Sequence, residues 1–310
     1  MATRQDYEKY KSLLGTPPEW LNKYLSLDIL TRLNDISLLC GMEYASHDIY
    51  NFAFSISRFE HSLNVALISW NLTHDKNATL GALFHDASSP VFSHCVDYMN
   101  GDYVNQESTE EKTEEILRGC PKLLEYLEQD NVSLEDVIDF KQYSVVDLPR
   151  PCMCADRLDN TIGVGMAWAQ NLTYEDAESI LRNTRLSLNE NDIYEISFDD
   201  IKTGELVSRV NDEINRLTHT NSDTYMMLLV AKIIKKLILL NLISYDDLYK
   251  LKENDILDIL DDNSDLDFEL AEQYEEFKTI KEAPIIEQPE IKDKTLNPLI
   301  KQKRLKMFEK

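Results

Sequence analysis

The chain has 310 residues, of which 43% are hydrophobic and 28% charged, with only 8 glycines and 9 prolines. This composition excludes collagenous, low-complexity and disordered chains, and the scarcity of glycine and proline favours long helices. The 56 acidic side chains outnumber the 32 basic ones, which gives a formal net charge of −24. Because such a surface repels polyanions, we expect no nucleic-acid polymer as a partner.

No segment has the roughly 20 consecutive apolar residues that a membrane span requires. The apolar run at 226–231 is followed by Lys232, Lys235 and Lys236. The first residues lack the apolar stretch of a secretory signal, and the five cysteines show no paired CxxC spacing. We therefore expect a cytoplasmic protein with no membrane contact, disulfide framework or zinc knuckle.

Helices are expected over most of residues 1–185. The apolar positions that recur at helical intervals lie within 25–36, 63–72 and 80–84. That spacing places them on one face of a helix. The start signals Ser133-x-x-Asp136 and Thr173-x-x-Asp176 predict two further helices. Another helix is expected from about Cys152 to Trp168, after Pro149 and Pro151.

The strand pattern is confined to residues 185–188 and 193–198, with a turn-forming segment between them. This pattern predicts a small β-hairpin on a helical body. The pattern over residues 206–242 then indicates one or two helices. Residues 245–277 form an acidic region with helical apolar spacing, and its charges are typical of a solvated face. Residues 282–310 contain three prolines and become basic at the end, so we expect an extended tail.

Four residues from three segments have metal-binding chemistry. His61 and His85 offer imidazole nitrogens, and Asp86 and Asp156 offer carboxylate oxygens. If they face one channel from separate helices, they form a site that suits Mn, Fe, Mg, Zn or Ni about equally and leaves positions for water and a phosphate oxygen. The alternative is a set of buried polar residues satisfied by hydrogen bonds.

The segments Arg58-Phe-Glu-His61-Ser-Leu, Phe84-His85-Asp86 with Pro90-x-Phe92-Ser-His94, and Asp156-Arg157-x-Asp159 resemble the HD-domain metal-dependent phosphohydrolase superfamily. Their flanks most resemble its deoxynucleotide triphosphohydrolase branch, over residues 51–164. The resemblance implies an all-α fold with an HD-domain helical core. We assign the core to residues 1–185, the β-hairpin and C-terminal helical extension to 186–281, and the basic tail to 282–310.

The resemblance also implies roles for individual residues. One divalent ion would be held by His61, His85, Asp86 and Asp156. Arg58 and Arg157 would contact substrate phosphate, although each could instead form a salt bridge with a neighbouring acid. Asp97 matches the acidic member of a catalytic pair, with Glu107 as a second proton-transfer candidate. His94 is a further catalytic candidate, either as a contact to phosphate or as a residue that supports the metal ligands. The alternative is that His94 only caps a helix.

The chain departs from the family pattern at several positions. Ser89 replaces a histidine used in phosphate or second-metal contacts, and Gln106-Glu107 stands where the family has a His-Glu pair. Asn160 replaces a sugar-stacking tyrosine, and Gly163-Val164 an Arg-Asp pair whose aspartate reads a sugar hydroxyl. A di-iron centre and deoxynucleotide specificity therefore do not carry over.

The resulting hypothesis is a phosphohydrolase for a nucleotide or a related small phosphorylated metabolite, associating through helical faces into at least a dimer by family analogy. The alternative is a catalytically weakened regulatory protein that binds a nucleotide. A mixed-valent iron oxygenase would need a second iron, for which Ser88 and Ser89 are poor ligands. The aromatic residues before the first ligand either wall a base-binding cleft or belong to the core. They are Tyr44, Tyr50, Phe52, Phe54 and Phe59. Trp168 and the Met226-Met227 pair are expected in the core.

Overall fold

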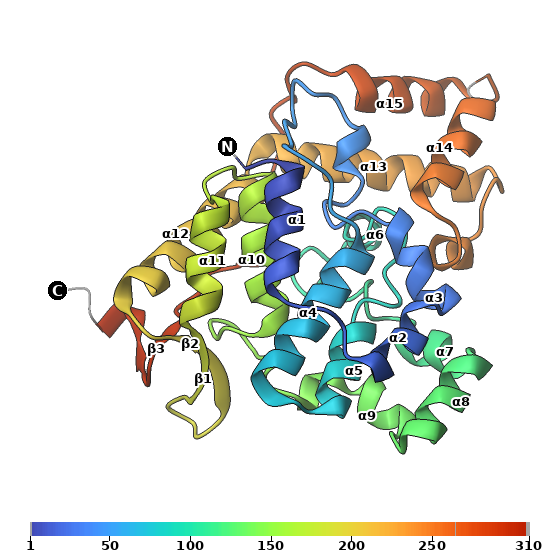
Figure 1. Ribbon diagram of the computed structural model, residues 1–310. Coiled ribbons are helices and arrows are strands. Elements are labelled where there is room, and N and C mark those ends of the chain that lie inside the picture. The colour runs from blue at the N-terminus through green and yellow to red at the C-terminus, as the bar shows by residue number, and fades with distance from the viewer. Residues whose placement is uncertain (1, 264, 308–310) are drawn as a thin grey trace.

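The computed structural model describes residues 2–263 and 265–307 and is dominated by α-helices (Figure 1). The helices are α1 (Arg4–Leu13), α2 (Asn22–Leu25), α3 (Asp28–Thr31), α4 (Arg58–Thr73), α5 (Lys76–Phe84), α6 (Cys95–Asn100), α7 (Thr113–Arg118), α8 (Pro121–Asp130), α9 (Leu134–Ile138), α10 (Ala155–Ala167), α11 (Tyr174–Asn183), α12 (Ile201–Thr218), α13 (Asn221–Leu239), α14 (Glu253–Asp262) and α15 (Phe268–Thr279). The expected all-α fold with a small sheet is confirmed.

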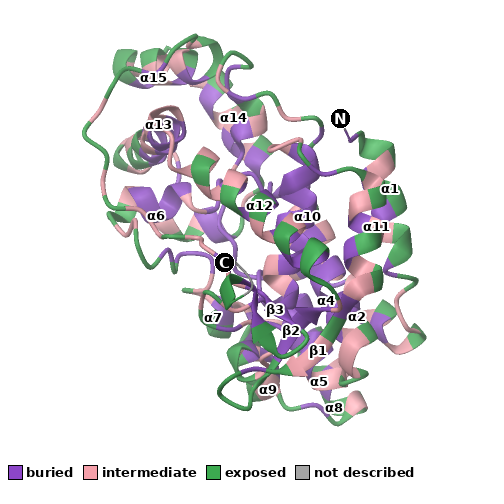
Figure 2. Cartoon of the chain, turned by 90° about the vertical axis from the view of Figure 1, so that its left-hand side faces the viewer, coloured by how far each residue is buried: buried purple, intermediate pink, exposed green. Residues whose placement is uncertain are grey.

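Helices α4, α5 and α10 form the centre of the molecule, where the ribbon is mostly buried (Figure 2). A capping box starts α4, since the Ser57 hydroxyl accepts from the Glu60 amide and the Glu60 carboxylate accepts from the Ser57 amide. Every residue of α5 from Ala78 to Phe84 is buried. Helix α4 buries Arg58, His61 and Asn64 beside its apolar side chains, and such buried polar groups stand out as functional candidates.

The predicted helix start signals and hairpin agree with the structure. Ser133 caps α9, and Thr173 forms a capping box with Asp176 at the start of α11. Strands β1 (Thr184–Leu188) and β2 (Tyr194–Phe198) pair antiparallel.

The C-terminal tail is more ordered than an extended segment on the surface. After α15 it runs back to the hairpin, where β3 (Leu299–Ile300) pairs parallel with β2 and β4 (Lys303–Arg304) pairs antiparallel with β3. The side chain of Arg304 is buried and forms an ion pair of 2.6 Å with Glu195. The tail is thereby fixed to the body, and residues 308–310 lie outside the described residues.

None of the described helices combines the length and apolarity needed to cross a membrane. Helix α13 reaches 19 residues, and lysines interrupt it from Lys232 onward.

Candidate metal centre

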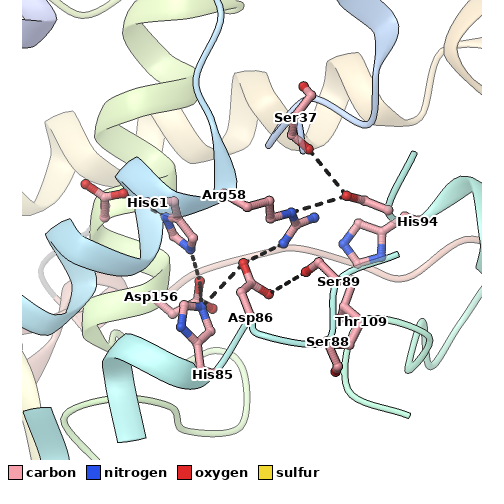
Figure 3. A network of polar contacts seen from close by, with 12 residues as sticks. Ser37, Arg58, His61, His85, Asp86, Ser88, Ser89, His94, Thr109 and Asp156 are labelled. Carbon is pink, nitrogen blue, oxygen red and sulfur yellow. Dashed lines mark hydrogen bonds and ion pairs between the residues drawn. The ribbon is translucent and has the colours of Figure 1, made fainter. Parts of the chain in front are cut away.

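The four predicted ligands converge although three different helices supply them (Figure 3). His61 lies in the first turn of α4, His85 and Asp86 follow the end of α5, and Asp156 lies in the first turn of α10. The Oδ1 atom of Asp156 is 3.0 Å from His61 Nε2 and 3.8 Å from His85 Nε2. His85 Nε2 is 3.7 Å from Asp86 Oδ2. This cluster of nitrogen and oxygen donors fits a divalent ion.

Contacts behind the ligands fix the orientation of both imidazoles. His61 Nδ1 is 2.7 Å from Asp159 Oδ2, and His85 Nδ1 is 2.7 Å from the carbonyl oxygen of Ala82. The Tyr10 hydroxyl donates to the other Asp159 oxygen at 2.6 Å. Each ring therefore turns its Nε2 atom toward the cluster, as a histidine that ligates a metal requires. Asp159 belongs to the recognised motif, but its role behind His61 was not predicted from the sequence.

Charge complementarity governs the titration of this cluster. Burial lowers the pKa of His61, but the hydrogen bonds with Asp156 and Asp159 outweigh burial and raise that pKa to about 10. Burial raises the pKa of Asp86. Nearby positive charges, of which that of Arg58 has the largest effect, outweigh burial and hold this pKa well below its usual value. The Asp86 carboxylate is thus ionised, which is the form that ligates metal, whereas His61 has to release its proton to bind an ion.

Arg58 is buried and pairs with a candidate metal ligand. Its Nη1 donates to Asp86 Oδ2 at 2.7 Å, and its Nε donates to Ser93 Oγ at 3.2 Å. Phe92 and Ser93 adopt positive φ values of 58° and 44°, a strained conformation for residues other than glycine. Ser89, which stands in place of the family histidine, donates to Asp86 Oδ1 at 3.3 Å.

A cavity of ≈ 260 Å³ opens from the ligand cluster. Arg58 and Arg157 both line it, and each is already paired with a carboxylate. Arg157 Nη2 donates to Asp147 Oδ1 at 2.8 Å, and its Nη1 donates to the carbonyl oxygen of Cys152 at 3.0 Å. Both arginines thus form the salt bridges that were the alternative to phosphate binding, and their contact with phosphate stays a prediction.

The three proton-transfer candidates differ in their access to the cavity. His94 lines the cavity, and its Nδ1 is 2.8 Å from Asp97 Oδ2. Asp97 is buried beside it and accepts from the Ser108 amide at 2.8 Å. Glu107 is exposed and borders a separate hollow on the surface. The neighbouring Gln106, with φ of 57°, lines the cavity instead.

Aromatic and apolar groups form another part of the wall. Tyr50 and Phe52 are stacked with ring centroids 5.3 Å apart, and Trp168 packs edge-on against Phe52. All three line the cavity, as does Met227, whereas Tyr44, Phe54 and Phe59 lie elsewhere. The Tyr50 hydroxyl donates to Asp223 at 2.7 Å, and burial raises the pKa of Asp223 to about 7. Part of the aromatic cluster and part of the expected core thus border the site.

Three cations of the cavity wall were not singled out in the sequence. They are Arg150, Lys292 and Lys294. None of the three forms an ion pair with another described residue. The sequence Lys-Asp-Lys at 292–294 could have indicated the two lysines as a pair. It lies in an expected extended segment, and alternate side chains of an extended chain point to the same side.

Comparisons with known proteins agree with this geometry. Residues 58–161 match the HD domain family. The chain is similar to the uncharacterized protein YdhJ of Bacillus subtilis, with 27% identity over 118 residues, which cover 37% of this chain and 35% of that protein. It is also similar to the metal-dependent phosphohydrolase cns2 of Cordyceps militaris, with 24% identity over 130 residues, which cover 42% and 37%.

These matches span little more than a third of either relative. The family match covers the region that supplies all four candidate ligands, from α4 to α10. Residues 58–161 therefore resemble an HD domain both in sequence and in the placement of the four candidate ligands.

Proposed function

We propose that the protein is a divalent-metal-dependent phosphohydrolase that acts on a nucleotide or a related small phosphorylated metabolite. The observation that carries this proposal is the convergence of two histidines and two aspartates at one end of a cavity that also contains several cations. An acidic protein binds a small anion through such a local basic pocket, even though its surface as a whole repels polyanions. The Cordyceps relative is named a metal-dependent phosphohydrolase, which is consistent with the same chemistry.

His61, His85, Asp86 and Asp156 would hold the ion. A divalent ion there would polarise a phosphoryl oxygen and lower the pKa of a water molecule. The chain itself contributes orientation, because Asp159 and the Ala82 carbonyl fix the two imidazoles. Arg58 lies next to the ligands and would contact the phosphate that reacts.

His94 is the residue that we assign to proton transfer. Its Nδ1 faces the carboxylate of Asp97, so Asp97 favours the tautomer that carries the proton on Nδ1. The Nε2 atom is then free to accept a proton, and it can donate one when the ring is charged. Asp97 acts through His94 as a positioning residue. Glu107, exposed and outside the cavity, contributes no step to this mechanism.

A regulatory protein that binds a nucleotide with little turnover is the second candidate function. It is favoured by Ser89 and Gln106, which stand where the family has histidines. Both are buried at the site, so neither position offers an imidazole for proton transfer.

The test compares the metal content of the wild type with that of Asp86→Asn, using protein purified without chelator or nickel affinity. Asp48→Asn is the matched control, because Asp48 also follows a histidine but is exposed and lies outside the cavity. We expect near one equivalent of metal in the wild type and control and almost none in Asp86→Asn. Equal, negligible metal in all three, persisting after Mn or Fe is added, would overturn the metal site.

Single-turnover release of phosphate from a panel of nucleotides then separates the two functions. A hydrolase releases phosphate with the metal-loaded wild type but not with Asp86→Asn. A regulatory protein binds a nucleotide in its metal-loaded form and releases no phosphate over hours.

A further inference from the structure

Two lysines of the C-terminal tail form part of the cavity wall. Lys292 and Lys294 line the cavity, and Asp293 between them is exposed. In an extended chain successive side chains point to opposite sides. The Asp293 carboxylate accepts from the Thr295 hydroxyl at 2.6 Å and from the Asn215 amide at 3.3 Å. Asp293 therefore points away from the lysines and does not neutralise them.

Contacts of the main chain hold this segment in place. The Lys294 amide donates to Asn215 Oδ1 at 3.0 Å, and its carbonyl oxygen accepts from Asn211 Nδ2 at 2.8 Å. The Lys292 amide donates to the carbonyl oxygen of Tyr103 at 3.1 Å. Both lysines are thus positioned by main-chain contacts with α12 and with the loop after α6, and the charged end of Lys294 takes no part in the anchoring.

These lysines, together with Arg150, form a cluster of cations that make no ion pair with the described residues, although Asp223, Glu110 and Asp293 attract them from a greater distance. Arg150 donates to the Lys294 carbonyl oxygen, and Lys292 Nζ donates to the Asn105 carbonyl oxygen at 2.7 Å. In the described part of the chain, Lys294 Nζ donates no hydrogen bond. A chain with 56 acidic residues has many carboxylates that could pair with these cations, so three unpaired cations on one wall indicate a site for an external anion.

The titration of the cluster supports this interpretation. Burial, followed by the charge of Arg157, lowers the pKa of Arg150 to about 10. Burial also lowers the pKa of Lys292 and of Lys294, and the charge of Arg150 adds to that effect at both lysines. A bound anion would relieve the mutual repulsion of the three charges.

We propose that Arg150, Lys292 and Lys294 form a second anion subsite, which binds a phosphate group of the substrate other than the one that reacts at the metal centre. The two subsites share one cavity, so the substrate class is a small molecule with at least two phosphate groups. The assignment of the first phosphate to the metal centre rests on the proposed function, whereas the tail subsite binds its anion without metal.

The test measures calorimetric binding of inorganic tripolyphosphate and orthophosphate to metal-free protein. The variants are wild type, the double variant Lys292→Gln with Lys294→Gln, and the control Lys303→Gln, whose lysine is an exposed residue of the same tail. We expect tripolyphosphate to bind wild type and control at least about 10-fold more tightly than orthophosphate, and to lose about 10-fold in affinity in the double variant.

Lys294→Arg keeps the charge and should hold tripolyphosphate within about 3-fold of wild type, which separates loss of charge from loss of fold. Equal tripolyphosphate affinity in the double variant and wild type would overturn the subsite, as would equal affinity of wild type for the two anions. Because no metal is present, this result stands apart from the metal-content test. If turnover is found, the double variant should raise KM for substrates with two or more phosphates and leave KM for monophosphates unchanged.

Discussion

The two walls of the cavity handle charge in opposite ways. On the metal wall Arg58 pairs with Asp86, Arg157 pairs with Asp147, and His61 lies between two aspartates. On the tail wall Arg150, Lys292 and Lys294 form no ion pair with any described residue. The metal wall is therefore organised before any ligand arrives, whereas the tail wall keeps its charges available and relies on backbone contacts for its shape.

The largest expected effect comes from breaking a pair on the metal wall. Arg58→Met leaves the Asp86 carboxylate buried without its cation, so we expect the free energy of unfolding of metal-free protein to fall by about 3 kcal/mol. Urea denaturation measures this change. Added metal should recover part of the loss, because an ion can replace the missing charge. A loss no larger than that of Lys303→Gln would show that the pair contributes little.

The next effect concerns His94, which lines the cavity beside Arg58. If His94 transfers a proton, His94→Gln should lower kcat about 100-fold and leave the metal content unchanged. Asp97→Asn should shift the pH profile of kcat because it removes the carboxylate that faces Nδ1. Unchanged kcat in His94→Gln would move proton transfer to another group. Loss of metal in that variant would show that His94 supports the ligands.

A smaller effect involves a buried acid behind the metal wall. Glu253 accepts from the Ser37 amide at 3.1 Å, and burial with the charge of Glu43 raises the pKa of Glu253 to about 8. The folded protein then binds this proton more tightly than the unfolded chain, whose carboxyl titrates near 4.5. The stabilisation is present below pH 4.5 and is lost as the pH rises through about 8.

Glu253→Gln should therefore be more stable than wild type at pH 8.5, by about 2 kcal/mol, with a shallower decline in stability between pH 5 and 8.5. Asp223, with a pKa of about 7, contributes a similar decline that this variant retains. Denaturation at a series of pH values measures both slopes. Parallel curves for the two proteins would show that Glu253 titrates normally.

The smallest effect has the opposite sign from the first. Lys294→Met removes a half-buried cation that forms no ion pair with the described residues, so we expect the metal-free protein to gain about 0.5–1 kcal/mol in unfolding free energy. The same urea experiment measures it, with Lys303→Gln as the control. A clear loss of stability would mean that Lys294 is neutralised in the folded protein, and the contrast between the two walls would disappear.

Local patterns in the sequence determined much of the helical framework and the metal end of the site. The Thr173-x-x-Asp176 signal formed its capping box, and the hairpin lies within one residue of its expected limits. His61, His85, Asp86 and Asp156 could be selected because metal ligands belong to few residue types and stand in recognisable flanks. Their convergence follows from the packing of α4, α5 and α10.

The tertiary structure alone decided which of several equivalent residues face the cavity. Gln106 and Glu107 are adjacent, and a backbone turn with positive φ at Gln106 buries the glutamine and exposes the glutamate. Lys292 and Lys294 resemble other tail lysines until backbone hydrogen bonds from distant Asn211 and Asn215 set their position. Local propensity acts over a few neighbouring residues, whereas a binding wall depends on contacts between segments far apart in the chain.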